Sequence, residues 1–418
     1  METEKIFGIN YHYIWSDAWW LEGDNAWFVA GAMDILLCLD CNNNITKLIG
    51  EIPSDRVCEF RQHPRCLKKG DIIICLPDRA NDIWLLRLSN NLWTRISLFN
   101  SQNVRIGCYN AWFIQDKLYI VSIGLKQIIE LNIEKECVEK YYNITENVKV
   151  KISASLMQEN CIYIVGNFPV TIYKFDCLTK NIQIYNLFEI NDELNTICFD
   201  GEKFWLSGKQ KRIYIWNEAT EAAISMDIIP KCFGVWNFNG NYSDSLNYFN
   251  DALGMPLFIN CVLGGQYVWF IPFQTNRIIY INKDTFQVKV FNIGDEDHTP
   301  DDIKLQLLQH KYLLEYIKDG RYIGLFSLKN KWVFEIDCKM LKYKILNYRI
   351  DESCRRLIKA LIAQAYFKKD KIMLEDQYFN LRNVLQDFSK GTSQKNNFVL
   401  KNSKFNSKSK NIFSVLKD

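Results

Sequence analysis

The stretch WFIPFQTNRIIYINKDTFQVKVFNI, residues 269–293, contains the pattern that decides the fold of this chain. An apolar run, a polar break, an alternating segment, a polar turn and a second alternating segment follow one another. Alternation of apolar and polar residues over roughly four to eight positions is typical of a half-buried β-strand, and polar clusters between such runs are typical of turns. The stretch therefore predicts consecutive antiparallel strands joined by short turns.

The same pattern recurs along the chain, so that seven copies can be aligned. Close matches begin at Trp27, Tyr119, Tyr163 and Trp205, and looser matches begin at Ile73 and Ile323. Each copy has a turn residue whose side chain can bond the nearby backbone. These residues are Asp40, Ser89, Asn132, Asp176, Asn217, Asn282 and Asp337. Another strand that ends in a turn precedes each copy, so each unit contains four strands in about 41 to 49 residues.

Four antiparallel strands at this period are typical of a β-propeller blade. A single blade exposes two apolar faces, and radial stacking against neighbouring blades buries them. We therefore predict an all-β, seven-bladed β-propeller within residues 1–350. Because two copies match only loosely, six or eight blades stay open, as does a β-sandwich with a second β domain. The predicted blades span residues 16–54, 63–100, 108–145, 153–190, 194–230, 256–295 and 309–350.

The aligned units resemble the kelch-like, galactose-oxidase-like β-propeller superfamily. Residues 83–98, IWLLRLSNNLWTRISL, are similar to the third strand, turn and closing tryptophan of a kelch blade, with Trp93 in the closing position. Residues 263–272, LGGQYVWFIP, contain the pair Gly264 and Gly265 and the aromatic residue that follows it. The chain also resembles uncharacterised bacterial kelch-like repeat proteins. The resemblance implies the blade fold and, by analogy, a binding role.

Composition limits the partners and the compartment. The 418-residue chain has a net charge of +3, which argues against specific nucleic-acid binding. Its first residues show no signal-peptide pattern, and no apolar run reaches the roughly 20 residues of a transmembrane segment. The 14 cysteines are scattered, many of them within apolar runs. We therefore expect reduced thiols and a cytoplasmic location.

The sequence contains no pattern that assigns a catalytic centre, a metal site or a cofactor. Galactose-oxidase chemistry needs tyrosine and histidine ligands to copper, and the four histidines of this chain show no paired pattern. Cys38 and Cys41 have C-x-x-C spacing, but one pair at a strand end favours a structural role over zinc or redox chemistry. The acidic residues 294–302 lack the spacing of a calcium loop and are expected to be solvated.

Two segments are candidate binding sites. Residues 230–256 form a long loop in which aromatic side chains lie among Asn, Ser and Gly. Rigid rings beside amides suit a sugar ring or a peptide, and capping of the propeller end is the alternative. The candidate residues of this loop are Trp236, Phe238, Tyr242 and Tyr248. Residues 54–65 contribute Arg56, Arg61 and His63 as candidates for binding an anionic group, with a solvated connection as the alternative.

The pattern changes after residue 350. Residues 351–388 have apolar positions at helical spacing, so they predict one or two amphipathic helices. These helices either pack on the propeller or dock to another protein. Residues 389–418 are rich in Ser, Asn and Lys and predict a flexible basic tail.

The leading hypothesis is a non-catalytic binding or scaffold propeller that holds a protein partner, or a glycan, at its face. It depends on a complete repeat fold in which no catalytic constellation is recognised. The alternative is a carbohydrate-binding or carbohydrate-active propeller that uses the aromatic loop 230–256.

Overall fold

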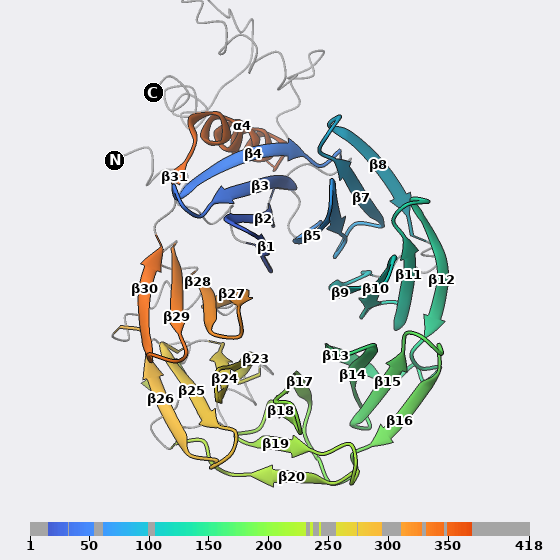
Figure 1. The fold of residues 1–418 in the computed structure, drawn as a ribbon, viewed down its shortest axis with the longest axis vertical. Helices are drawn as coiled ribbons and strands as arrows, with labels where there is room; N and C mark the ends of the chain where they lie inside the picture. Colours follow the sequence, from blue (N-terminus) through green and yellow to red (C-terminus); the bar gives the residue numbers. More distant parts are fainter. Residues whose placement is uncertain are drawn as a thin grey trace, which may run out of the picture.

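The computed structural model describes residues 16–31, 33–53, 62–98, 105–230, 235–236, 242–243, 256–273, 275–294, 311–327, 332–346 and 349–369. Within them the chain forms seven antiparallel sheets arranged in a ring around a central axis (Figure 1). Each sheet is one blade, numbered 1 to 7 in chain order, and strands that are consecutive in the chain pair within it. The predicted all-β, seven-bladed propeller is confirmed.

Every blade has four strands in radial order, from the central axis outwards (Figure 1). The innermost strands are β1 (Trp20–Glu22), β5 (Arg65–Lys69), β9 (Cys108–Ile114), β13 (Lys151–Gln158), β17 (Leu194–Phe199), β23 (Phe258–Gly264) and β27 (Tyr312–Lys318). The second strands are β2 (Asn25–Ala30), β6 (Ile72–Leu76), β10 (Lys117–Ser122), β14 (Cys161–Asn167), β18 (Phe204–Gly208), β24 (Tyr267–Pro272) and β28 (Tyr322–Ser327). The third strands are β3 (Ile35–Asp40), β7 (Asp82–Arg87), β11 (Gln127–Asn132), β15 (Thr171–Asp176), β19 (Ile213–Trp216), β25 (Arg277–Asn282) and β29 (Val333–Asp337). The outermost strands are β4 (Ile45–Glu51), β8 (Leu92–Ser97), β12 (Cys137–Asn143), β16 (Ile182–Asn186), β20 (Ala223–Met226), β26 (Val288–Asn292) and β30 (Lys342–Leu346).

The turn between the third and the outermost strand has the same construction in most blades. In blade 1 the Asp40 carboxylate accepts hydrogen bonds from the backbone N–H groups of Asn42 and Asn43, both at 3.0 Å. Asn44 then has a positive φ of 54°, the left-handed geometry that Asn tolerates well. Equivalent side-chain-to-backbone bonds occur at Asn132, Asp176, Asn217, Asn282 and Asp337. The predicted turn chemistry therefore holds in these six blades.

Blade 2 uses a different turn. Arg87 occupies the end of its third strand and forms an ion pair with Glu136 of blade 3, Nη2 to Oε1, at 2.6 Å. Ser89, the predicted turn residue, donates its hydroxyl and its backbone N–H to the Asp71 carboxylate. Ser89 therefore binds the neighbouring turn between the first and second strands.

The apolar core is divided among the interfaces between blades. Seven clusters of buried side chains occur, and each joins two adjacent blades of the ring. The largest side chains that are fully buried include Trp205, Trp216 and Trp269, all from second or third strands. The central strands of each blade are packed on both faces, which explains why they read as continuous apolar runs.

The ring closes between blade 7 and blade 1. The Trp19 backbone N–H donates to the Glu315 carbonyl at 2.7 Å, and the Ser16 hydroxyl donates to the Glu315 carboxylate at 2.6 Å. Strand β31 (Arg349–Ile350) then returns to blade 1 and pairs in parallel with β4. Helix α4 (Glu352–Lys369) follows and lies against the outside of blade 1 (Figure 1).

Helix α4 covers the first part of the predicted helical extension. Residues 370–388 and the predicted basic tail, 389–418, lie outside the described residues. In the part of the chain that the structure describes, no helix is both long and apolar enough to span a bilayer. The twelve cysteines in this part are all free.

Candidate functional site

The chain passes from blade to blade at one end of the ring. Because each blade has four antiparallel strands, the connection from an outermost strand to the next innermost strand lies at the same end as the turn between the second and third strands. We call this end the connection face. Loops carried on a rigid scaffold are the usual location of binding sites, so a binding site is expected on this face.

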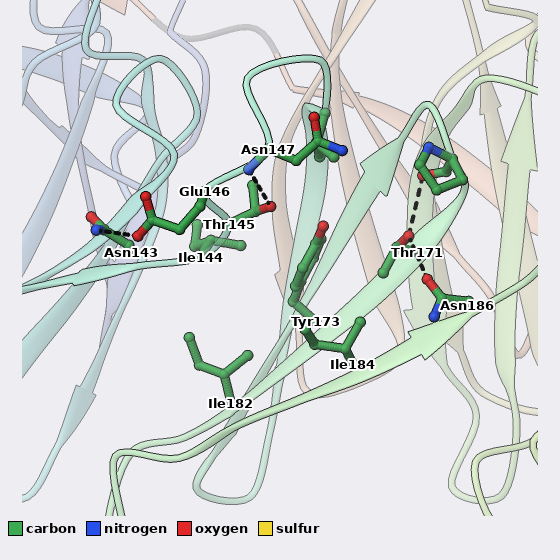
Figure 2. Close-up of a pocket in the computed structure, with 12 residues that line it drawn as sticks. Asn143, Ile144, Thr145, Glu146, Asn147, Thr171, Tyr173, Ile182, Ile184 and Asn186 are labelled. Carbon is green, nitrogen blue, oxygen red and sulfur yellow. Dashed lines mark hydrogen bonds between the residues drawn. The ribbon is translucent and has the colours of Figure 1, made fainter.

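At blade 4 the connection face contains a pocket with a volume of about 410 Å³. The pocket lies between the connection from blade 3, the turn that follows β14, and the outer strands β15 and β16 (Figure 2). Its lining residues are Asn143, Ile144, Thr145, Glu146, Asn147, Val150, Pro169, Thr171, Tyr173, Ile182, Ile184 and Asn186. The mixture of aliphatic side chains with amides and hydroxyls is typical of a binding pocket for an organic ligand or a peptide side chain.

Exposed apolar side chains flank this pocket. Val148 is 85% exposed, Phe168 57%, Ile184 57% and Phe188 78%. Ile184 lines the pocket, and each of the others lies within two residues of a lining residue. We call these four residues the rim. Large exposed apolar side chains that gather at one pocket mark an interaction site more often than isolated ones do.

The polar groups near the mouth of the pocket are mostly bonded to one another. The Thr171 hydroxyl donates to the Pro169 carbonyl at 3.2 Å and lies 3.3 Å from Asn186 Oδ1. The Asn147 backbone N–H donates to the Thr145 hydroxyl at 3.1 Å (Figure 2). These bonds hold the turn and the connection in place, so the pocket is preformed.

Tyr173 is the exception among these groups. Its residue is only 5% exposed, yet the structure records no hydrogen bond for its hydroxyl within the described residues. The ring packs so closely that a Cβ placed on Gly166 would lie 2.8 Å from Tyr173 Cε2. Figure 2 shows the hydroxyl directed towards the loop that carries Asn147. Among the described residues, the fully buried side-chain atoms that lack a hydrogen-bond partner do not include this hydroxyl oxygen. The hydroxyl is therefore open to the pocket and can donate to water or to a ligand.

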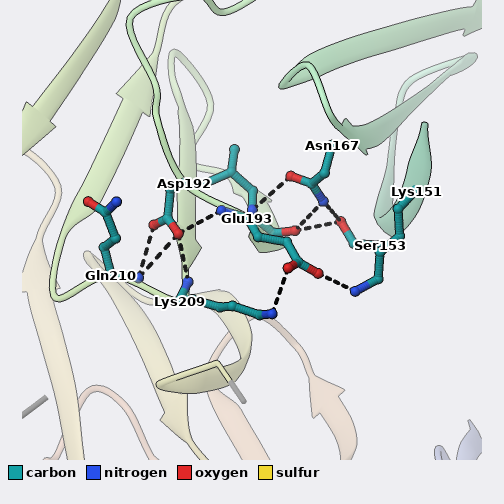
Figure 3. A network of polar contacts seen from close by, with 8 residues as sticks. Lys151, Ser153, Asn167, Asp192, Glu193, Lys209 and Gln210 are labelled. Carbon is teal, nitrogen blue, oxygen red and sulfur yellow. Dashed lines mark hydrogen bonds and ion pairs between the residues drawn. The ribbon is translucent and has the colours of Figure 1, made fainter. Parts of the chain in front are cut away.

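Blade 5 has a bonded network at the corresponding place (Figure 3). Asp192 accepts hydrogen bonds from the backbone N–H groups of Glu193, Lys209 and Gln210. Burial is the main cause that raises the pKa of Asp192, and these hydrogen bonds act against it. Glu193 forms ion pairs with Lys209, at 2.6 Å, and with Lys151 of blade 4. The network joins the connection from blade 4 to the turn after β18.

The predicted site residue His63 is buried between blades 1 and 2. Its Nδ1 lies 3.1 Å from Asp34 Oδ2, and its Nε2 lies 2.9 Å from the Asp82 carbonyl oxygen. Its backbone N–H also donates to Asp34. Both ring nitrogens are thus engaged inside the protein. The other two candidates of this segment, Arg56 and Arg61, lie outside the described residues.

The aromatic loop is described only in part. Val235–Trp236 (β21) pairs with Tyr242–Ser243 (β22), and this register sets Trp236 opposite Tyr242. Phe238 and Tyr248 lie outside the described residues, so binding by this loop stays a prediction.

The C-x-x-C pair lies at the end of β3. Cys38 is buried, and its thiol donates to Asn25 Oδ1 at 3.7 Å, whereas Cys41 is exposed. Burial, above all, raises the pKa of Cys38 to about 11, which disfavours the thiolate that binds metals. No cluster of three His, Cys, Asp or Glu side chains suited to a metal ion occurs within the ranges described above.

Sequence reasoning did not find the blade 4 pocket. The signal was present, because Val148, Phe168 and Phe188 are large apolar residues in turns and connections between strands. Apolar residues at turn positions are expensive to expose, and this makes them informative. Their convergence at one pocket depends on packing between blades, which no local pattern encodes.

No family model and no curated protein sequence matches this chain. Solved structures do match. The crystal structure of BamB from Moraxella catarrhalis matches at 11% identity, covering 77% of this chain and 84% of that chain, with a TM-score of 0.50. A chain in the crystal structure of a mitotic checkpoint complex matches at 10% identity, covering 81% of this chain and 88% of that chain, with a TM-score of 0.52. At these identities the likeness shows the fold alone: this chain is a seven-bladed β-propeller.

Proposed function

We propose that this protein is a protein-binding scaffold that holds a partner at the connection face of blade 4. One observation carries the proposal: each of the four exposed apolar side chains of the rim either lines a preformed pocket or lies within two residues of its lining. Covering such side chains with a partner removes apolar surface from water, which is the main driving force of protein association. That one similar propeller was solved as part of a checkpoint complex supports a binding role by analogy.

The rim suits a partner segment that is extended. Strand β16 is the outermost strand of blade 4, and within the described residues it pairs with β15 alone. Blade 1 offers a precedent, because its own outermost strand is covered by the short parallel strand β31. An extended segment laid along β16 gains backbone hydrogen bonds and places alternate side chains in the pocket.

The rim is tested by a triple variant, Phe168→Asn, Ile184→Thr and Phe188→Ser. Asn tolerates the positive φ of 67° at Phe168, and Thr suits a strand, so each change removes apolar surface with little backbone strain. Peptides selected from a displayed random library against the full chain are then titrated by fluorescence polarisation. We expect the triple variant to bind them at least about tenfold more weakly.

The matched control is Leu178→Ser. Leu178 is 53% exposed and belongs to blade 4, but it lies in the turn after β15, at the other end of the blade. This control should bind the selected peptides as the parent chain does. If the triple variant folds and binds as tightly as the parent, the connection face of blade 4 is not the binding surface.

Three finer assignments stay proposals. Carbohydrate binding by loop 230–256 predicts that Trp236→Ala and Tyr242→Ala abolish binding on a glycan array. A cytoplasmic location accords with the free thiols of the twelve described cysteines. Membership of the kelch-like group depends on the blade pattern around Trp93 and Gly264.

A further inference from the structure

Blades 4 and 5 share the same register around one tyrosine each. Both blades have a β-bulge between the innermost and second strands, next to Gly166 in blade 4 and Gly208 in blade 5. The residue two positions before each glycine lies opposite a tyrosine of the third strand, Tyr173 in blade 4 and Tyr214 in blade 5. The two tyrosines are therefore structural equivalents.

The two blades differ in the group that meets the tyrosine. In blade 5 the Tyr214 hydroxyl donates to Asp192 Oδ2 at 3.2 Å. In blade 5, Asp192 lies two residues before the residue that pairs with Gly208. In blade 4, Val150 lies two residues before the residue that pairs with Gly166. A Cβ placed on Gly208 would lie 2.6 Å from Asp192 Oδ2, and one placed on Gly166 would lie 3.0 Å from Val150 Cγ1. The valine thus stands where blade 5 has its carboxylate, and it cannot accept a hydrogen bond.

Two lysines lie near the blade 4 pocket. The Lys126 ammonium donates to the Val148 carbonyl at 2.6 Å, beside the pocket. Lys149, in the same connection, is exposed and forms no ion pair with a described residue. The one acidic residue in the lining, Glu146, accepts a hydrogen bond from Asn143 at 2.9 Å. Glu146 and the exposed Glu189, which follows Phe188, balance the charges of these two lysines. The Tyr173 hydroxyl, and not the net charge, is therefore the group that favours a ligand with an acceptor oxygen.

We propose that the blade 4 pocket binds an aspartate or glutamate side chain in an extended segment of the protein partner, with the Tyr173 hydroxyl as its donor. This inference rests on the proposed function and names the chemistry of the partner. The bound carboxylate takes the role that Asp192 has in blade 5, and apolar residues beside it cover Phe168 and Ile184. A hydrogen bond to an ionised acceptor is roughly twice as strong as one between neutral groups.

Small probes test the pocket chemistry without a known partner. The full chain, labelled at the isoleucine methyl groups, is titrated with N-acetyl-aspartate N-methylamide and with its neutral asparagine counterpart. Ile144, Ile182 and Ile184 line the pocket and report binding. We expect the aspartate probe to shift these methyl signals and to bind about tenfold more tightly than the asparagine probe. Tyr173→Phe keeps the ring and removes the hydroxyl. This variant should bind the aspartate probe no more tightly than the neutral asparagine probe.

Tyr214→Phe is the matched control, because its hydroxyl already has an acceptor in Asp192. It should leave binding of the aspartate probe unchanged. Equal affinity for the two probes, or an unchanged affinity in folded Tyr173→Phe, overturns the inference. The inference is also overturned if the selected peptides bind the triple rim variant weakly but bind Tyr173→Phe as tightly as the parent. In that case the proposed function stands. If the selected peptides bind the triple rim variant as tightly as the parent, the proposed function is overturned. The affinity of the aspartate probe then still tests the chemistry of the pocket.

Discussion

At the scale of single residues, a glutamate bonded by two tyrosines and a lysine joins adjacent blades. Glu218 of blade 5 accepts hydrogen bonds from Lys174 at 2.5 Å, Tyr163 at 2.7 Å and Tyr185 at 2.8 Å, all from blade 4. Burial and the bond to Glu218 raise the pKa of Tyr185 to about 12. Burial also acts to raise the pKa of Glu218, but these three hydrogen bonds outweigh it and lower that pKa. A related set joins blades 3 and 4, formed by Glu130, Tyr142, Lys180 and Tyr119.

The Glu218 cluster predicts acid-sensitive stability. Because its pKa is lower in the folded chain, Glu218 stabilises the fold fully above its unfolded value of about 4.3, and the contribution is lost as the pH falls below that value. Glu218→Gln should lower the free energy of unfolding by about 1 to 3 kcal/mol at pH 7. The difference from the parent should shrink as the pH falls from 4 towards 2, measured by urea unfolding. A difference that stays constant over that range contradicts this assignment.

At the scale of elements, strand β31 and helix α4 cover the outside of blade 1. Asp351 caps α4, since its carboxylate accepts the Cys354 backbone N–H at 2.7 Å. Leu357 and Leu361 then pack into the cluster shared by blades 1 and 7. Of the two roles expected for this segment, packing on the propeller is the one that the structure shows for residues 352–361. The helix therefore contributes to the closure of the ring.

Leu357→Ala tests this contribution. Leu357 is buried, so the change leaves a cavity under α4 and should lower the free energy of unfolding by about 2 to 5 kcal/mol. Arg356→Ala, on the exposed side of the same helix, should change it by less than about 0.5 kcal/mol. Both values follow from urea unfolding monitored by tryptophan fluorescence. If Leu357→Ala and the parent unfold at the same urea concentration, packing of α4 does not stabilise the ring.

At the scale of the whole molecule, bulge residues on the innermost strands of blades 4, 5 and 7 form hydrogen bonds to the next blade of the ring. The Ser153 hydroxyl of blade 4 donates to the Leu194 carbonyl of blade 5, and Asn195 of blade 5 donates to the Phe258 carbonyl of blade 6. In blade 7 the bulge residue is Glu315. It accepts from Ser16 and so completes the ring with residues far apart in the chain.

Glu315 makes ring closure sensitive to pH in the opposite direction from Glu218. Burial first, and then the nearby Asp17, raise the pKa of Glu315 well above its usual value, while Ser16 and Arg65 oppose the shift. In the unfolded chain Glu315 loses its proton near pH 4.3, whereas in the folded chain it keeps the proton to a higher pH. The free energy of unfolding therefore falls as the pH rises from about 4.3 towards the pKa of Glu315 in the folded chain.

Glu315→Gln keeps an acceptor for Ser16 and removes the ionisation. It should raise the free energy of unfolding at pH 7 and leave it nearly unchanged at pH 4. Thermal unfolding of the two chains at both pH values measures this. Ser16→Ala serves as the control and should lower stability at both values by about 1 kcal/mol. If Glu315→Gln is no more stable than the parent at pH 7, ionisation of the buried carboxyl does not destabilise the closed ring.

The repeat of strands and turns was readable from the sequence because it is local. The alternation in residues 269–293 and the turn residues Asp40 and Asp176 specify hairpins through contacts only a few positions apart. Since one such unit cannot bury both of its faces, seven of them imply a ring. The amphipathic segment after residue 350 likewise indicated a helix.

Tertiary structure alone decided the candidate site and the closure of the ring. Asn147 and Pro169, the lining residues next to Val148 and Phe168, come from different turns, and only the packing of blade 4 brings them to one pocket. The missing acceptor of Tyr173 becomes visible only when the registers of blades 4 and 5 are compared. His63, predicted as an anion ligand, is enclosed by Asp34 and the Asp82 carbonyl of neighbouring blades. Local periodicity encodes which residues form strands, whereas contacts between blades depend on how whole sheets stack, which no short segment specifies.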